Sequence, residues 1–252
     1  MKTERTVIAN DFHGKFRDRI ACKLLFGFIR REKPDRVILN GDIGDFYTIS
    51  RFIKDPRRKW DLQDECDDVV KLLKQIRACA PKAKIVYIEG NHEARLRTFL
   101  NGTSPALASI RDLQLESLLH LKSLGIKYIA GDNQKAKERD RGGMWLGDLF
   151  VYHGCLIRAK AGYTAHAELA KNGCSGISGH SHRDGKAPIR NRNGQFCWWE
   201  NFCMCQLDAE YITGVADWTQ GWSMVTTIGK RPDVEPVAVL GGKYTYRGKQ
   251  YA

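Results

Sequence analysis

The chain has 252 residues, of which 42% are hydrophobic and 28% are charged, a composition typical of globular proteins. This length is sufficient for one large domain with a buried core, and the lack of an apolar run of roughly 18 residues excludes a membrane-spanning helix. The formal net charge of +12 favours polyanionic partners such as nucleic acid, although a basic surface can also serve solubility alone.

Short apolar runs alternate with amphipathic stretches along the chain. In chain order, we first expect a strand at 6–10, a helix at about 15–31, a strand at 36–40, a helix at about 62–78 and a strand at 84–89. A helical region from about 107 to 125 and strands at 126–129 and 149–152 should follow. The last elements of this pattern are a helix at about 161–171 and a buried strand at 176–178. The charged segments 54–59 and 135–141 are expected to be loops.

Strands that alternate with helices in this way predict an α/β fold with a largely parallel or mixed sheet covered by helices. The sequence shows no repeat and no linker, so we expect one domain over residues 1–252. Its motif-bearing core would span about 6–185, and a β-rich C-terminal part would span about 186–252.

The eight cysteines are scattered and form no C-x-x-C pair, which indicates free thiols in a reducing cytoplasm rather than a disulfide framework. Cys197, Cys203 and Cys205 lie close together in the sequence, which leaves a soft-metal site open. The first residues carry charge where a signal peptide has its apolar segment. We therefore expect a cytoplasmic protein with no membrane partner.

Polar motifs follow five of the expected strands. They occupy residues 11–13, 41–45, 90–93, 153–154 and 179–182. Ligand sites in such sheets form beyond the carboxyl ends of the strands, so we expect these motifs to meet at one edge. Five of the seven histidines lie in the motifs, which isolated structural histidines do not explain.

The motifs combine carboxylate, amide and imidazole groups. This mixture suits borderline divalent ions such as Mn, Zn, Fe, Co or Ni rather than Ca. Glycines at 41, 90, 154 and 179 would let the backbone turn sharply and approach the ligands closely. The sequence therefore predicts a metal site.

The order D-x-H, G-D-x-x-D, G-N-H-E, H-G and G-H-x-H, between residue 9 and about 183, resembles the calcineurin-like metallophosphoesterases. The resemblance implies a four-layer α/β/β/α sandwich with two metal ions at the C-terminal edges of the strands, manganese being favoured. It implies these ligand sets: Asp11, His13 and His182 for one metal, Asn91, His153 and His180 for the other, and Asp42 bridging the two.

The chemistry implied by the resemblance is hydrolysis of a phosphate ester by a hydroxide shared between two ions roughly 3.5–4 Å apart. His92 would protonate the leaving oxygen or stabilise its charge, and Asp45 would orient His92. In the serine/threonine phosphatase branch an arginine that grips phosphate follows this aspartate, whereas Phe46 and Tyr47 follow it here. A protein phosphatase is therefore disfavoured.

Arg95 and Arg183 are the candidates to bind the substrate phosphate instead, the alternative being that they are ordinary surface charges. Basic residues also cluster after the second motif, at 51–59, and after the last, at 183–192, with aromatic residues between or behind them. A positive groove with aromatic platforms is how single-stranded nucleic acid is held, although these aromatics could instead pack in the core. The aromatics in question are Phe46, Tyr47, Phe52, Trp60, Phe196, Trp198, Trp199 and Phe202.

We therefore expect a two-metal phosphodiesterase for nucleic acid or nucleotide-like diesters, nuclease action included. The alternative is a phosphomonoesterase for small phosphorylated metabolites or nucleotides, and a non-catalytic nucleic-acid-binding module is disfavoured by the presence of His92. The segments 90–96 and 211–221 resemble uncharacterised phosphoesterases of bacteriophages. Related nucleases often work as dimers, so a homodimer is also an expectation.

Overall fold

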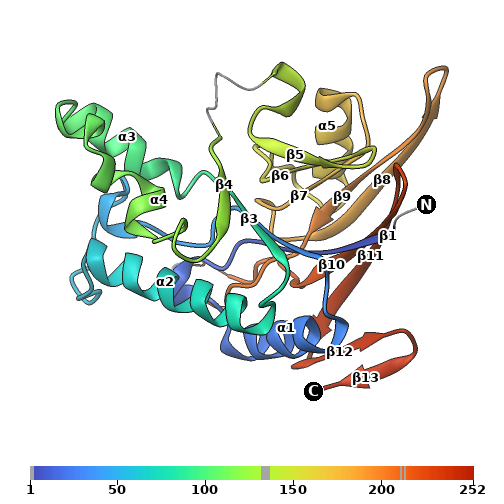
Figure 1. The fold of residues 1–252 in the computed structure, drawn as a ribbon, viewed down its shortest axis with the longest axis horizontal. Coiled ribbons are helices and arrows are strands. Elements are labelled where there is room, and N and C mark those ends of the chain that lie inside the picture. The colour runs from blue at the N-terminus through green and yellow to red at the C-terminus, as the bar shows by residue number, and fades with distance from the viewer. Residues whose placement is uncertain (1–2, 132–136, 211, 213) are drawn as a thin grey trace.

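The computed structural model describes residues 3–131, 137–210, 212 and 214–252. In these ranges the chain forms two β-sheets that face each other, with helices on both outer faces (Figure 1). None of the described helices is long and apolar enough to cross a membrane.

The first sheet has eight strands and contains both the N-terminal and the C-terminal parts of the chain. In spatial order they are β13 (Lys249–Tyr251), β12 (Lys243–Tyr246), β11 (Arg231–Leu240), β10 (Gln220–Ile228), β1 (Thr3–Ala9), β2 (Arg36–Asn40), β3 (Lys84–Ile88) and β4 (Ile126–Ile129). Strands β1 to β4 are parallel, and the remaining strands are antiparallel. Strands β10 to β13 of the β-rich C-terminal part thus extend the same sheet that the first motifs follow.

The second sheet has five strands. In spatial order they are β5 (Gly143–Leu146), β6 (Leu149–Tyr152), β7 (Gly176–Ser178), β9 (Gly194–Asn201) and β8 (Asp184–Asn191). Strand β5 was not expected from the sequence, and it pairs antiparallel with β6 across a tight turn. Strands β6, β7 and β9 are parallel to one another.

The alternation of side chains along the strands explains the layering. Ile8 and Ile38 of the first sheet face Val151 and Ile177 of the second, and together they form an apolar layer between the sheets. The neighbouring residue Val7 points the other way, into the core beneath the helices. The strands are therefore buried on both faces, which is why they read as continuous apolar runs.

Helices cover both outer faces. Helices α1 (Arg19–Glu32) and α2 (Leu62–Cys79) pack on the first sheet, and α5 (Tyr163–Asn172) packs on the second. Helix α1 begins later than expected because Asp18 caps it, its carboxylate accepting a hydrogen bond from the backbone N of Ala21 at 2.7 Å. The four-layer α/β/β/α arrangement is confirmed.

The prediction of one helical region between 107 and 125 was wrong. The structure has helix α3 (Ala94–Thr103) before it, two 3₁₀ turns, η3 (Leu107–Ser109) and η4 (Arg111–Leu113), and the short α4 (Leu115–Leu118). Pro105 disfavours helical geometry at the preceding residue and so separates these pieces. The apolar side chains that suggested a continuous helix are in part exposed, as at Leu107 and Ile110.

The remaining 3₁₀ turns are η1 (Gly14–Phe16), η2 (Tyr47–Ile49) and η5 (Glu138–Asp140). The first two follow the motifs at 11–13 and 41–45 in the sequence, and η5 lies in the charged segment 135–141, which was expected to be a loop. Lys135 and Ala136 of that segment lie outside the described residues, as do Tyr211 and Thr213 of the phage-like segment. The charged segment 54–59 is a loop, as expected.

Candidate metal centre

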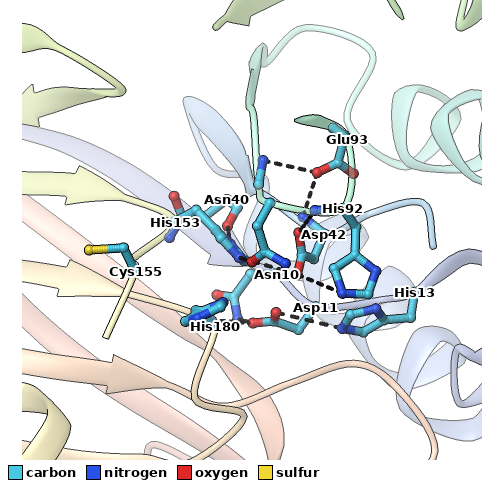
Figure 2. A network of polar contacts seen from close by, with 12 residues as sticks. Asn10, Asp11, His13, Asn40, Asp42, His92, Glu93, His153, Cys155 and His180 are labelled. Carbon is cyan, nitrogen blue, oxygen red and sulfur yellow. Dashed lines mark hydrogen bonds and ion pairs between the residues drawn. The ribbon is translucent and has the colours of Figure 1, made fainter. Parts of the chain in front are cut away.

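The five polar motifs meet where the parallel strands of the two sheets end. Asp11 and His13 follow β1, and Asp42 follows β2. His153 follows β6 of the other sheet, so side chains from both sheets converge on one place (Figure 2). The expectation that the motifs share one edge is confirmed, with the addition that two sheets contribute to it.

The first group of side chains comprises Asp11, His13 and His182. Nε2 of His13 lies 3.0 Å from Nε2 of His182. Oδ1 of Asp11 lies 3.2 Å from Nε2 of His182 and 3.8 Å from Nε2 of His13. This oxygen is buried and has no hydrogen-bond partner in the described part of the chain. A buried carboxylate oxygen without a donor, facing two imidazole nitrogens, fits a cation bound among the three.

The second group comprises Asn91, His153 and His180. Oδ1 of Asn91 lies 3.1 Å from Nε2 of His153. The rings of His153 and His180 have their centroids 5.2 Å apart. Asp42 joins this group, because its Oδ2 lies 3.2 Å from Nε2 of His153.

Asp42 belongs to both neighbourhoods. Its carboxylate and the ring nitrogens of His153 and His180 lie within 4.8 Å of one another, and the same holds for Asp42 with His13 and His92. The donors are the carboxylate, amide and imidazole groups that borderline divalent ions prefer. The residues present therefore fit a divalent metal centre in which Asp42 lies next to both groups.

The backbone at this site is strained. Ten described non-glycine residues have positive φ, and half of them are predicted metal ligands, namely Asp11, His13, Asp42, His180 and His182. Each such residue costs about 1–3 kcal/mol, and this strain is typical of functional sites. The left-handed turns explain how alternate residues such as Asp11 and His13 present their side chains to the same point.

Two glycines leave room for the ligands. A Cβ at Gly90 would lie 2.2 Å from Oδ1 of Asp42, and a Cβ at Gly179 would lie 2.5 Å from Oδ2 of Asp11. Neither glycine has a positive φ, so the requirement is for space rather than for a special backbone angle. The prediction that these glycines allow close approach is confirmed.

Glu93 holds the second and third motifs together, a role that the sequence interpretation missed. Its buried carboxylate accepts backbone N–H hydrogen bonds from Asp42, Ile43, Gly44 and Gly90 at 2.8–3.0 Å. The hydroxyl of Tyr87 donates a further hydrogen bond at 2.7 Å. The signal was the glutamate directly after His92, an acidic residue immediately before helix α3.

Asn10 and Asn201 join the two sheets beside the metal centre. Nδ2 of Asn10 donates to the backbone O of Asn201 and of Phe202, each at 3.0 Å. Nδ2 of Asn201 donates in turn to the backbone O of Ile8 at 3.2 Å. These bonds fix the end of β1, and therefore Asp11, against the end of β9.

His92 and Asp45 lie together as expected. Nδ1 of His92 lies 2.9 Å from Oδ1 of Asp45. Nη2 of Arg95 lies 3.0 Å from Nε2 of His92, and Nη1 of Arg95 donates to the backbone O of Asp45 at 2.6 Å. Arg95 is thus held beside His92 on the first turn of α3 rather than on the outer surface.

The side chains of the site stabilise positive charge placed among them. Burial favours neutral His153, but Asp42 outweighs it and raises the pKa of His153 to about 10 from the ordinary 6.5. Burial also opposes ionisation of Asp11, yet His182 and His13 hold its pKa below the usual range. Without a metal, a proton on His153 takes the place that a cation would fill, whereas burial lowers the pKa of His180 and of His182.

Cys205 also lies beside the first group, which the sequence did not indicate. Its sulfur and the ring nitrogens of His13 and His182 lie within 4.8 Å of one another. A hydrogen bond with Cys203, together with burial, raises the pKa of the Cys205 thiol. Cys197 belongs to none of the described groups of three ligand side chains, so the suggestion of a site formed by the three clustered cysteines was wrong.

A cavity of about 590 Å³ opens onto these side chains. Beyond the motif residues it is lined by Phe16, Tyr47, Phe52, Ile53, Asp55, Arg58, Arg95, Ile157, Arg183, Glu210 and Trp218. Of the two basic clusters, Arg58 and Arg183 are the members that line it. The expected positive rim is therefore narrower than the sequence suggested.

The three arginines of the cavity wall are all engaged. Nε of Arg58 lies 2.7 Å from Oε1 of Glu210, and Nε of Arg183 lies 2.8 Å from Oδ2 of Asp217. Arg95 is bound to the Asp45 backbone, as described above. Arg95 and Arg183 thus line the cavity, as expected of substrate-binding residues, with their charges already partly balanced.

Several aromatic residues suggested as nucleic-acid platforms are core residues. Phe46, Trp198 and Phe202 are at most 1% exposed, so that interpretation was wrong for them. Phe52 is 64% exposed and lines the cavity, as does Tyr47. Trp218 lines it too, although it was noted in the sequence only as part of the phage-like segment.

The family match agrees with this geometry. The family model for calcineurin-like phosphoesterases matches residues 4–184. The chain is 28% identical to the Gene 54 protein of Mycobacterium phage D29 and 26% identical to that of Mycobacterium phage L5, with 98% of each chain covered in both cases. It is 13% identical to a dimetal phosphatase from Danio rerio, with a TM-score of 0.48 over 92% of this chain and 95% of that one. The protein belongs to the calcineurin-like phosphoesterase family and is a metal-dependent phosphoesterase.

Proposed function

We propose that this protein is a two-metal phosphodiesterase that hydrolyses nucleic-acid or nucleotide-like diesters, nuclease action included. In this proposal Asp42 contacts both ions, and manganese is the favoured metal. The two ligand sets are Asp11, His13 and His182 for one ion, and Asn91, His153 and His180 for the other. When bound, two such ions supply an activated water and positive charge for the phosphate oxygens.

His92 is the proton donor to the leaving oxygen in this proposal. Its Nδ1 donates to Asp45 at 2.9 Å and its Nε2 accepts from Nη2 of Arg95 at 3.0 Å, so transfer requires a second proton on Nε2 and the turning of Arg95 away from this nitrogen. Arg95 lies 3.0 Å from that nitrogen and would stabilise negative charge that develops on the leaving oxygen. Both side chains line the cavity into which the ester must enter.

The observation that carries the preference for a diester is the pairing of the three cavity arginines. A phosphate monoester carries close to two negative charges at neutral pH, because its second pKa is about 6, whereas a diester carries one. Arg58 and Arg183 are bound to carboxylates, and Nη1 of Arg95 lies 3.9 Å from Oδ1 of Asp45, so these side chains leave little uncompensated positive charge for a dianion. The net charge of +12 supports a polyanionic diester such as nucleic acid.

The test is turnover of an aryl phosphate diester and the matched aryl monoester by the manganese-loaded protein and its His92→Ala variant. We expect the diester to be preferred, and that activity to be lost in the variant while metal content is retained. Preference for the monoester would replace this proposal with a phosphomonoesterase. Binding of nucleic acid without turnover of either ester would replace it with a non-catalytic binding module.

If the diester is preferred, single-stranded and double-stranded DNA and RNA are the next substrates. Circular and linear forms of the same molecule separate internal cleavage from cleavage at ends. Internal cleavage and cleavage at ends are both compatible with an open cavity lined by side chains from several loops.

A further inference from the structure

Two aromatic side chains stand at the two ends of a row of contacts that crosses the metal centre. At one end, the ring of Trp218 meets the ring of His182 edge-on, with centroids 4.3 Å apart. The row continues through His13, whose ring centroid lies 5.0 Å from that of His182 and 4.4 Å from that of His92.

The other end of the row is Phe52. Arg95 contacts Nε2 of His92 at 3.0 Å, and its guanidinium lies 5.8 Å from the centroid of the Phe52 ring. Trp218 is thus joined to the His182 side of the centre, and Phe52 to the His92 side. Both rings line the same cavity.

The mouth of this cavity is unusually apolar. Phe52 is 64% exposed, Ile53 is 96% exposed and Ile157 is 53% exposed, and all three line it. Large apolar side chains grouped at the opening of a site indicate a ligand with an apolar surface. The cavity arginines are already paired, so they offer little to further charged groups of a ligand. Flat, uncharged groups on either side of the phosphate suit this cavity better.

We propose that Phe52 and Trp218 form two stacking subsites, one for each organic group of a phosphodiester. The Phe52 subsite, beside His92, takes the group that leaves, and the Trp218 subsite, beside His182, takes the group that stays on the phosphate. The substrate class is then a diester with a planar aromatic group on each side of the phosphate, as in two adjacent nucleotides. This inference rests on the proposed phosphodiesterase function and adds the substrate class and the residues that select it.

A structural role for either ring predicts a different result. If Trp218 only supports His182, its loss weakens turnover of every substrate to the same extent, because every substrate needs the metal centre. A stacking subsite acts only on substrates that have an aromatic group to stack. Two diesters with one leaving group in common therefore separate the two roles.

The experiment measures kcat/KM for phenyl p-nitrophenyl phosphate and methyl p-nitrophenyl phosphate. These share the p-nitrophenolate leaving group and differ in the group that stays. In the unmodified protein we expect the phenyl ester to be preferred about tenfold, which corresponds to one stacking contact of ordinary strength. The preference should fall to near one in Trp218→Ala and should be largely restored in Trp218→Phe, which keeps an aromatic face.

Substitutions at the other subsite should behave differently. Phe52→Ala should lower kcat/KM for both esters about tenfold without changing their ratio, because both share the leaving group, and Phe52→Tyr should restore it. Phe99→Ala is the matched control, since Phe99 is a 41% exposed phenylalanine on α3 that does not line this cavity. It should change neither value.

Two outcomes overturn the inference separately from the proposed function. Turnover with no preference for the phenyl ester, or a preference that persists in Trp218→Ala, rejects the stacking subsite and leaves the phosphodiesterase standing. No turnover of either diester by the manganese-loaded protein rejects the phosphodiesterase, and this inference falls with it. Unchanged melting temperatures of the variants show that they are folded.

Discussion

Oδ1 of Asp45 lies 2.9 Å from Nδ1 of His92, and the same oxygen lies 3.2 Å from Nδ1 of His13. One carboxylate therefore orients both the proposed proton donor and one proposed metal ligand. Asp45 is nearly buried, so these contacts are made largely out of contact with water. Burial alone would raise the pKa of Asp45, but its hydrogen bonds with His13 and His92 hold that pKa below the usual range.

Replacing Asp45 by asparagine should lower activity through His92. Groups that orient ligands and catalytic histidines typically contribute about 10-fold to 100-fold to metal affinity or activity, and we expect a loss of that size in kcat at saturating manganese. At saturating manganese, which masks a loss of metal affinity through His13, Asp45→Asn combined with His92→Ala should be scarcely worse than His92→Ala alone, because the remaining effect of Asp45 acts through His92. Asp55→Asn is the control, an acid on the cavity rim paired with Arg57. Losses that multiply in the double variant under these conditions would contradict the action of Asp45 through His92.

Glu93→Gln should destabilise the protein, because a side-chain amide cannot accept all the hydrogen bonds that the carboxylate now accepts. Hydrogen bonds to a buried charged group contribute about 1.5–3 kcal/mol each, so we expect a loss of about 3 kcal/mol in the free energy of unfolding. Tyr87→Phe removes one of the five donors and should cost about 1 kcal/mol. Urea unfolding of the metal-free variants measures both, and equal effects of the two substitutions would refute the role assigned to Glu93.

Gly90→Ala should abolish high-affinity metal binding. The added Cβ would lie 2.2 Å from Oδ1 of Asp42 and 2.4 Å from its backbone N, so the proposed bridging carboxylate must move. Gly27→Ala in α1 is the matched control, because a Cβ there meets nothing within 4 Å. That change should stabilise the helix by about 0.5–1 kcal/mol. The measurement is the metal content of both variants by elemental analysis. A Gly90→Ala variant with two tightly bound ions would show that the site tolerates the movement of the Asp42 carboxylate.

Stability should depend on pH in opposite ways with and without metal. In the metal-free protein the pKa of His153 is raised to about 10 from 6.5, so its contribution to stability is complete below pH 6.5 and is lost as the pH rises toward 10. The lowered pKa of Asp11 acts at the other end, giving stability above its ordinary 3.8 that disappears in stronger acid. His153 and Asp11 thus both contribute fully between about pH 4 and about pH 6.5, whereas the lowered pKa of His180 and of His182 gives stability above pH 6.5 that is lost as the pH falls.

Metal ions must displace the imidazole protons to bind, so their stabilising effect should grow as the pH rises. The measurement is the difference in melting temperature between manganese-loaded and chelator-treated protein at about pH 6 and about pH 9. We expect the larger difference at the higher pH. A difference that shrinks with rising pH would mean that the protonated histidines are not the metal ligands.

The sequence by itself determined the family, the motif residues and the central strands. This was possible because each motif follows directly on an apolar strand, and strand ends in such sheets point to a common edge. His92 and Asp45 could be paired from a resemblance alone, and the structure places them in contact. Such motifs can be recognised because they consist of consecutive residues.

Tertiary structure decided what depends on residues far apart in the chain. Glu93 is recognisable as a support only once its acceptors face the backbone of residues 42–44, about fifty positions away. Composition suggested a broad basic rim, but Glu210 and Asp217 pair with two of its arginines across the fold. Burial likewise separated Phe46 and Trp198, which are core, from Phe52, which is exposed at the cavity. Charge pairing and burial arise from packing, and neither is written in the local sequence.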